Sequence, residues 1–284
     1  MSETMGTAVV TGASSGIGAV YADRLAERGY DLVLIARSAD KLARVAERIR
    51  AKTGSKVDIL PADLANAADL AQVEAFLRDT PDVTLLVNNA GLGGALKLVN
   101  SDVDQMTSLI SLNVTALTRL TYAVVPQFIA RGAGTIINIA SIVAINPEAL
   151  NGVYGGSKAF VLAFSQNLQH ELAGTGVIVQ VVLPGATATD FWAIAGRPIE
   201  QLPGEMVMRS EDLVDAALTG LDRGEFATIP SLQDSELFDA YEAARRAMIG
   251  KLSTAVPASR YRDGSDRLPG ISPSSASTSR PVLP

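Results

Sequence analysis

Thr7-Ala8-Val9-Val10-Thr11-Gly12-Ala13-Ser14-Ser15-Gly16-Ile17-Gly18 is the stretch that decides how this chain begins to fold. Its first four residues form a short apolar run of the kind found in buried strands. A glycine-rich turn follows. Apolar residues then recur at helical spacing through Tyr21 and Leu25 to Gly29, a typical C-terminal stop. Strand, glycine-rich turn and helix, in that order, are the setting that a phosphate-binding turn requires.

The glycines of this turn have the spacing G-x-x-x-G-x-G, at Gly12, Gly16 and Gly18. This differs from the G-x-G-x-x-G spacing of the common dinucleotide fingerprint. A helix start offers free N–H groups and partial positive charge to an anion, and glycines let the backbone come close to it. The turn therefore indicates a pyrophosphate site, and a tight Gly-Ser turn without a ligand is the structural alternative.

Strand and helix patterns alternate along the rest of the chain. Apolar runs that indicate buried strands lie at residues 31–35, 57–60, 83–87, 134–141, 177–183 and 226–229. Helical patterns lie at residues 39–52, 67–78, 102–130, 154–171, 212–221 and 235–249. Such alternation calls for a parallel sheet covered on both faces. We predict the α/β class: a Rossmann-fold doubly wound parallel β-sheet in a three-layer α/β/α arrangement, with ligands at the carboxyl ends of the strands.

Composition excludes several functions. The 284 residues are 48% hydrophobic, carry a net charge of −6 and include no Cys. The acidic balance, without a basic block, argues against nucleic acid or an anionic membrane as the main partner. Without Cys there is no thiol nucleophile or zinc–thiolate site. No uninterrupted apolar run approaches ~18 residues and no secretory signal is recognised, so we expect a cytoplasmic protein without membrane spans.

The stretch Tyr154-Gly155-Gly156-Ser157-Lys158 opens an apolar helical run to about Glu171. Tyr and Lys four residues apart lie on one face of a helix. An ammonium ~4 Å away is worth ~4 kcal/mol at an effective dielectric of ~20. It would lower a phenol pKa of ~10 by ~3 units if burial did not oppose it. The spacing predicts a phenol that exchanges a proton near neutral pH; a core tyrosine beside a solvated lysine is the alternative.

Arg37 follows the second predicted strand and lies 19 residues past Gly18. In a dinucleotide fold this strand end meets the adenosine ribose. An acid there binds the 2′-hydroxyl of NAD, whereas an arginine accommodates the 2′-phosphate of NADP. No acid stands in that place, so the sequence predicts NADP. An arginine on an exposed strand end is the alternative.

Two other polar groups have ordinary explanations. Asp102 and Asp104 resemble a metal-binding pair, but acidic residues at a predicted helix start usually stabilise the helix. His170, the only histidine, lies sixteen positions past Tyr154. That separation is ~24 Å along a continuous helix. We therefore predict no metal site and no catalytic histidine.

Further motifs complete a pattern: TGASSGIG at 11–18, Asp63, NNAG at 88–91, Asn113, Ser141, Tyr154 with Lys158, and Pro184-Gly185. In this order and spacing the chain resembles the short-chain dehydrogenase/reductase family over roughly residues 5–250. The resemblance implies a nicotinamide-dependent oxidoreductase on a Rossmann sheet.

The resemblance also implies roles for particular residues. Tyr154 would be the acid/base, Ser141 would hydrogen-bond the substrate oxygen, and Lys158 would hold the nicotinamide ribose and lower the tyrosine pKa. Asn113 would position a water and proton relay. Together with Arg37, the expected cofactor contacts are Gly12, Ser14, Ser15, Gly16, Ile17, Gly18, Asp63, Leu64, Asn89, Ala90, Gly91, Tyr154, Lys158, Pro184, Gly185, Thr187 and Thr189.

Two positions depart from the family pattern. Thr187 stands where a branched apolar residue is often found, although Thr189 matches the later threonine. Ser15 stands where some NADP-binding members carry a basic residue. The NADP prediction therefore depends on Arg37.

The reaction also follows from the residues. Reducing a carbonyl needs a hydride, which only a cofactor supplies, and it needs a proton donor and a group that stabilises charge on oxygen. Tyr154 and Ser141 fit the last two needs. Zinc-assisted transfer lacks its ligands, and a serine hydrolase lacks a usable histidine. We predict an NADP-dependent carbonyl reductase or secondary alcohol dehydrogenase acting on a small-molecule carbonyl or alcohol.

Two alternatives stay open. A reductase of carrier-bound 3-oxoacyl chains would need a basic docking patch, for which Arg119, Arg131 and Arg197 are candidates. A non-catalytic NADP-binding sensor would keep the glycine turn but would not need the four predicted catalytic residues.

The predicted lid segments, residues 92–96, 142–150 and 191–204, are largely apolar, which favours a hydrophobic ketone or aldehyde. Within them, Phe191-Trp192 is either a substrate wall or the lid's own core. We predict one catalytic domain over residues 1–250 and a loosely ordered Ser/Pro-rich tail over residues 251–284. From the family we expect a homo-oligomer, either a tetramer or a dimer.

Overall fold

The glycine-rich stretch joins the first strand to the first helix, as the sequence predicts. Strand β1 (Thr7–Thr11) is fully buried, and helix α1 begins at Gly16 and ends at Glu27. The computed structural model of the chain describes residues 5–195 and 198–262. The chain divides into two units, Met1–Gln233 and Asp234–Pro284, and the sheet belongs to the first.

Within the described residues, seven parallel strands form one sheet in the order β3-β2-β1-β4-β5-β6-β7. The order reverses between β1 and β4, which is where doubly wound sheets bind ligands. The predicted parallel, doubly wound sheet is confirmed. After β1, the strands are β2 (Asp31–Ala36), β3 (Val57–Pro61), β4 (Val83–Asn88), β5 (Gly134–Ile139), β6 (Val177–Val182) and β7 (Ala227–Thr228).

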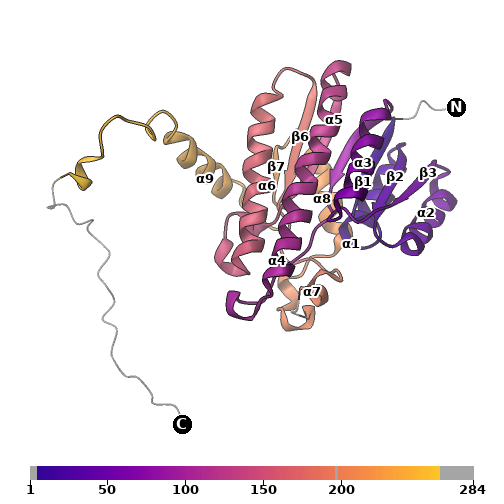
Figure 1. Cartoon of the computed structure of the whole chain (residues 1–284), viewed down its shortest axis with the longest axis horizontal. Helices are drawn as coiled ribbons and strands as arrows, with labels where there is room; N and C mark the ends of the chain where they lie inside the picture. The colour runs from indigo at the N-terminus through magenta and orange to yellow at the C-terminus, as the bar shows by residue number, and fades with distance from the viewer. Residues whose placement is uncertain (1–4, 196–197, 263–284) are drawn as a thin grey trace, which may run out of the picture. The chain divides into compact units, whose positions relative to one another are not determined.

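Each strand is followed in the chain by a helix or a short helical turn, as Figure 1 shows. The long helices begin and end near the residues that the sequence predicts. They are α2 (Ala39–Thr53), α3 (Ala67–Asp79), α4 (Val103–Ile110), α5 (Leu117–Arg131), α6 (Gly152–Glu171), α7 (Phe191–Ile194), α8 (Ser210–Asp222) and α9 (Glu236–Ala247). Shorter turns are η1 (Leu98–Asn100), the π-helical η2 (Ser111–Ala116), η3 (Ile142–Ala144), η4 (Pro147–Ala149), η5 (Ile199–Gln201), η6 (Gly204–Met206) and η7 (Ser259–Tyr261).

Successive residues of β1 show how the three layers form. Ala8 and Val10 pack into a core with α1, α2 and α8, whereas Val9 between them packs into a second core with α3 and α5. Side chains of a strand point alternately to opposite faces, so a strand that is apolar throughout must be covered on both. Helix α6 adds Val161 and Leu162 to a third cluster, beside α5 and β6.

The stretch Val103–Arg131 bears on our expectation that the chain has no membrane span. It comprises α4, η2 and α5, and among the described residues it is long and apolar enough to cross a membrane by length and composition. The stretch contains no long uninterrupted apolar run, because uncharged polar residues such as Asn113 divide it. Core helices of soluble proteins meet the same criterion. Here Leu120, Val124 and Phe128 pack into the core beside α3.

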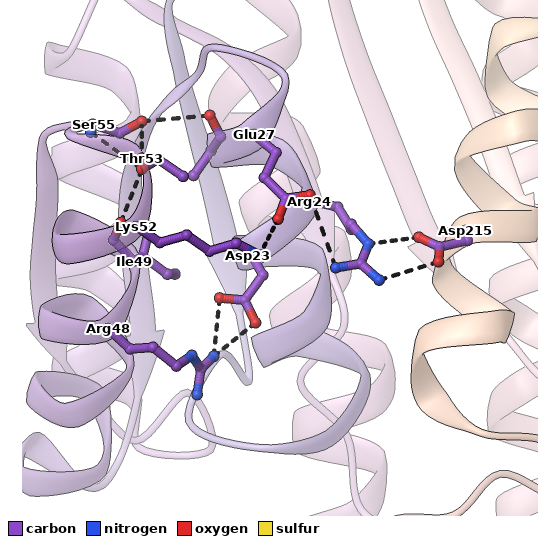
Figure 2. A network of polar contacts seen from close by, with 10 residues as sticks. Asp23, Arg24, Glu27, Arg48, Ile49, Lys52, Thr53, Ser55 and Asp215 are labelled. Atoms are coloured by element: carbon purple, nitrogen blue, oxygen red, sulfur yellow. Dashed lines mark hydrogen bonds and ion pairs between the residues drawn. The ribbon is translucent and has the colours of Figure 1, made fainter.

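Charged side chains bind α1 to its two neighbouring helices (Figure 2). Arg24 donates two hydrogen bonds to Asp215 of α8, at 2.6 and 3.1 Å. On the other side, Arg48 of α2 pairs with Asp23 at 2.8 Å. Exposed pairs of this kind contribute only ~0.2–1 kcal/mol each, so they reinforce a packing that the buried apolar residues create.

The second unit contains the last predicted helix. That helix, predicted at residues 235–249, is α9 (Glu236–Ala247), and none of its residues is buried. The first unit ends at Gln233, earlier than the predicted boundary at residue 250. Residues 263–284 of the predicted tail lie outside the described part of the chain.

Candidate active site

The glycine-rich turn packs against the loop after β4. A Cβ on Gly12 would lie 2.7 Å from Asn89 Nδ2 and 2.9 Å from Ala90 Cα, and Gly12 has a φ of +66°. A Cβ on Gly18 would lie 2.4 Å from the Gly12 carbonyl oxygen. Asn89 Nδ2 in turn donates to Thr11 O at 2.9 Å. Gly12 and Gly18 are therefore required for the turn to pack closely against the loop after β4, where the strand order reverses.

The third glycine lies beside the side chain of Thr189. Gly16 has a φ of +54°, and a Cβ there would meet only Thr189, at 3.0 Å. Ser15, which precedes the helix, makes no side-chain capping hydrogen bond. The first N–H groups of a helix have no intrahelical acceptor, so at α1 they are available to an anion. These features fit a pyrophosphate between the helix start and Thr189.

The residues predicted to meet the adenosine lie at the ends of β2 and β3. Arg37 directly follows β2 and is exposed, and it has no hydrogen bond or ion pair to any described residue. Asp63 follows β3 and is partly buried; its Oδ1 accepts a hydrogen bond from Ala65 N at 3.0 Å. Leu64 beside it is buried. Arg37, Asp63 and Leu64 therefore lie near the strand ends, as the sequence predicts. The side chain of Arg37 is free to bind a phosphate.

Three predicted catalytic residues meet where β5 ends and α6 begins. Ser141 lies close enough to Tyr154 to lower the pKa of its phenol through a side-chain interaction. Lys158 Nζ donates to Ile139 O at 2.9 Å and lies 5.9 Å from the centre of the Tyr154 ring. All three side chains are buried. The prediction that Tyr154 and Lys158 share one helical face is confirmed.

The predicted acidity of the phenol is wrong for the protein chain by itself. Burial raises the pKa of Tyr154 to about 12, although the interaction with Ser141 lowers it. Burial also lowers the pKa of Lys158 to about 8. Both groups lose solvation on burial, which disfavours their charged forms.

Asn113, the fourth predicted residue, lies in the π-helical turn η2 between α4 and α5. Its Nδ2 donates to Leu92 O at 2.9 Å and to Ser157 Oγ at 3.1 Å, while its Oδ1 accepts from Leu92 N at 2.8 Å. A Cβ on Gly91 would lie 3.1 Å from Asn113 Oδ1 and 3.7 Å from Lys158 Nζ. Asn113 therefore joins the loop after β4 to helix α6.

The segment after β6 returns to the same edge of the sheet. Pro184 O accepts from Ile142 N at 3.0 Å and from Ser141 Oγ at 3.3 Å. Thr187 is buried, and its hydroxyl donates to Gly185 O at 3.1 Å. The segment thus reaches from Ser141 to the Thr189 side chain beside Gly16.

Apolar side chains from the three predicted lid segments cover Tyr154. Leu92, Leu150 and Phe191 pack with it in one cluster. The ring centres of Phe191 and Tyr154 lie 5.6 Å apart. Phe191 also meets Trp192 edge-on, so the aromatic pair is both part of the lid's packing and a cover for the tyrosine.

Sequence reasoning missed Ser157 and Gly93. Ser157 Oγ links Asn113 to the Tyr154 carbonyl oxygen, to which it donates at 2.8 Å. Its position three residues after Tyr154 could have indicated the shared face. Gly93, which lies under the Phe191 ring, has no comparable sequence signal.

Other candidates lie elsewhere. Asp102 caps α4 by accepting from Asp104 N at 2.9 Å, as expected of acidic residues at a helix start. Arg119 pairs with the buried Glu74, and Arg131 donates to Val83 O at the start of β4, opposite the site. Arg197 lies outside the described residues. The two described arginines therefore do not form a docking patch at the site.

Solved structures with the same architecture include two of high similarity. One is a short-chain dehydrogenase from Sphingobium yanoikuyae in complex with NADPH, with a TM-score of 0.88 and 46% identity over 91% of this chain and 100% of that one. The other is a bulky-bulky ketone specific alcohol dehydrogenase from Comamonas testosteroni, with a TM-score of 0.84 and 42% identity over 91% and 99%.

Curated relatives include larger proteins. The 17-beta-hydroxysteroid dehydrogenase type 3 of Homo sapiens is 38% identical over 64% of this chain, and the match spans only 59% of the human protein. A very-long-chain 3-oxoacyl-CoA reductase of Anas platyrhynchos is 34% identical over 72% of this chain and 66% of its own length. The family model described as short chain dehydrogenase matches residues 6–197. With this match, the glycine turn and the cluster around Tyr154, the chain belongs to the short-chain dehydrogenase family.

Proposed function

We propose that the protein is an NADPH-dependent oxidoreductase, a carbonyl reductase or secondary alcohol dehydrogenase that acts on a hydrophobic ketone or aldehyde. One observation carries the proposal: Tyr154, Ser141 and Lys158 converge beside the glycine turn. A sensor that only binds the cofactor would not need this convergence. The similarity to an NADPH complex and to a bulky-bulky ketone specific alcohol dehydrogenase supports the chemistry.

A bound nicotinamide would supply the hydride. Ser141 and Tyr154 would hold the substrate oxygen by hydrogen bonds. Since burial raises its pKa to about 12, Tyr154 is protonated at neutral pH and is poised to donate to the developing alkoxide. The protonated phenol is the form that the reduction of a carbonyl requires.

Lys158 and Asn113 would support that donor. Lys158 Nζ keeps two N–H groups beyond its bond to Ile139 O, and these would hold the ribose hydroxyls and stabilise a phenolate. Asn113 hydrogen-bonds both Leu92 of the loop after β4 and Ser157 of α6, and so fixes the position of that loop relative to Tyr154. Such positioning is what allows a proton donor to act in the right geometry.

The cofactor would extend from Asp63 and Leu64 through the glycine turn to Thr187. Arg37 would bind the 2′-phosphate, because it is exposed and makes no bond to any described residue. Within the chain, the preference for NADPH over NADH is inferred from Arg37.

A 3-oxoacyl reductase is the second candidate. The similarity to a very-long-chain 3-oxoacyl-CoA reductase favours it, as does the apolar cover over Tyr154. Against it, Arg119 and Arg131 are bound to other groups and do not lie at the site. We therefore place it behind reduction of a small hydrophobic carbonyl.

We also propose a cytoplasmic homo-oligomer. Tyr122 of α5 is 69% exposed and stacks on Phe164 of α6, which stacks on Phe160. A second copy would present the same aromatic patch, so the patch suits a two-fold interface between identical chains.

The test is a screen of carbonyl compounds in which NADPH consumption is followed by absorbance. Apolar ketones and aldehydes should be turned over better than charged carbonyls. Tyr154→Phe should lose activity by at least about 100-fold, the lower range for general acid catalysis, and should still bind NADPH. Undiminished turnover by Tyr154→Phe, or best turnover of a charged compound, would contradict the proposal.

A further inference from the structure

The ring of Phe191 covers the predicted proton donor. Phe191 is the first residue of α7, and its ring centre lies 5.6 Å from that of Tyr154, with an angle of 49° between the ring planes. Tyr154 is only 5% exposed. A substrate oxygen must reach the Tyr154 hydroxyl, so a group that covers the tyrosine must yield. Phe191 is only partly buried, whereas Val143 and Leu109 of the same cluster are 3% and 1% exposed.

The tip of this ring rests on Gly93. A Cβ on Gly93 would lie 2.3 Å from Phe191 Cζ, 2.5 Å from Cε2 and 3.0 Å from Cε1. Gly93 is not among the described glycines with positive φ, so its backbone conformation would accept a side chain. The three atoms nearest to that Cβ all belong to the Phe191 ring. Glycine at this position therefore serves the Phe191 ring and not the turn.

The backbone around Phe191 is held in place. Trp192 is buried, and its Nε1 donates to Thr187 O at 3.0 Å. Ala195 N donates to Phe191 O at 2.8 Å, and Ala195 O accepts from Ala95 N at 3.3 Å. Since the bonds to Thr187 and Ala95 hold the backbone of α7, access past Phe191 to Tyr154 would require its side chain, and not the helix, to move.

We propose that Phe191 and Gly93 together determine which carbonyl compounds the site accepts. The Phe191 ring fills the space for one of the two groups that flank the substrate carbonyl. When the Phe191 ring rotates away from Gly93, the space above the Gly93 backbone becomes available to that group. The ring then forms one apolar side of the space. The substrate class is therefore a ketone with an apolar, preferably planar, group on that side. This inference rests on the proposed function and deepens it.

The first experiment compares Phe191→Ala with the wild type on a series of phenyl ketones in which the second group grows from methyl to propyl to phenyl. Removing the ring should raise kcat/KM for the largest ketone relative to the smallest by about tenfold or more, the range expected for apolar pocket contacts. The Kd for NADPH should not change. Leu98→Ala, at an 81% exposed position of the neighbouring loop, is the matched control and should leave the size profile unchanged.

The second experiment uses Gly93→Ala with Phe191 present and with Phe191→Ala. The added methyl should push the ring aside and lower both Tm and kcat/KM when Phe191 is present. Both losses should largely vanish in the double variant, because the clashing atoms are gone. Equal losses in both backgrounds would overturn the role given to the pair.

The outcomes separate the inference from the proposed function. If the wild type reduces ketones but Phe191→Ala leaves the size profile unchanged, the inference alone fails. If the wild type reduces no carbonyl compound, the proposed function fails and the substrate inference fails with it. The Tm comparison still tests the contact between Phe191 and Gly93 in that case.

Discussion

At the scale of single residues, burial has opposite effects on two neighbouring groups. It raises the pKa of Tyr154 to about 12 and lowers that of Lys158 to about 8. Each shift favours the neutral form, because a buried charge loses its solvation. The chain by itself therefore holds a protonated tyrosine and a lysine that gives up its proton easily. A bound cofactor would change both environments.

Lys158 should destabilise the protein at neutral pH. Its pKa falls from 10.5 to about 8 on folding, a cost of about 3 kcal/mol at about 1.4 kcal/mol per unit. Lys158→Met removes this cost but also a hydrogen bond worth about 1 kcal/mol, so we expect a net gain of about 2 kcal/mol at pH 7. Urea unfolding without added cofactor measures the gain.

The difference in stability between Lys158→Met and the wild type should depend on pH. Between about pH 8 and 10.5 the unfolded chain binds more protons at this lysine than the folded chain, so the stability of the wild type should rise relative to Lys158→Met. The gap should be widest below pH 8, should close before pH 10.5 and should then reverse, because Lys158→Met also lacks the hydrogen bond to Ile139 O. The exposed Lys97→Met is the control and should show no such trend. A gap that does not depend on pH would refute the assignment.

Arg37 should determine the choice of cofactor. Loss of one charged hydrogen bond to a phosphate costs about 1.5–3 kcal/mol, so Arg37→Ala should lower kcat/KM with NADPH by roughly 10- to 100-fold. Activity with NADH should barely change, because NADH lacks the phosphate. Steady-state kinetics with both cofactors measure this. Arg44→Ala, at an exposed arginine of α2, should leave both values unchanged. Equal use of the two cofactors by the wild type would remove the role.

At the scale of helices and strands, the site depends on irregular elements. The π-helical turn η2 directs Asn113 toward Leu92 and Ser157. Turns of this kind occur frequently at functional sites. The regular helices contribute differently: α1 presents its uncapped start to the cofactor, and α2 and α8 hold it in place through packing and exposed ion pairs.

The pair of Arg24 with Asp215 should contribute little. Its side chains are 26% and 52% exposed, so we expect Asp215→Asn to cost at most about 1 kcal/mol. Arg24 holds the pKa of Asp215 below its usual value, so the contribution is present above about pH 3.8 and is lost as pH falls through the lower, folded value. A double-mutant cycle with Arg24→Gln by urea unfolding measures the coupling. A coupling unaffected by about 1 M salt would contradict this account.

At the scale of the whole molecule, the proposed aromatic interface on α5 and α6 should control assembly. Tyr122→Lys places a charge in the aromatic patch and should shift the mass measured by light scattering toward the monomer. Desolvating an unpaired charge in an interface is costly. Lys substitution at Leu237, an exposed position of α9 in the second unit, is the control. A wild-type protein that is already monomeric would contradict the proposal.

Much of the fold could be predicted because local patterns suffice for it. The apolar runs, the glycine turn and the alternation of strand and helix require a covered parallel sheet, and such a sheet brings its carboxyl ends to one edge. Tyr154 and Lys158 share a helical face for geometric reasons alone. That Ser141 and Tyr154 would act on the same substrate oxygen was implied only by the resemblance to the family.

Only the tertiary structure decided the electrostatics and the cover of the site. The sequence estimate placed an ammonium beside a phenol, but the pKa of each group depends on how deeply both are buried, which no local pattern gives. Likewise Gly93 and Phe191 lie far apart in the sequence, and nothing in either segment indicates that the ring rests on the glycine. The sequence by itself determined the sheet and which residues its edge collects. Tertiary packing determined which of them lose contact with water and which side chain covers them.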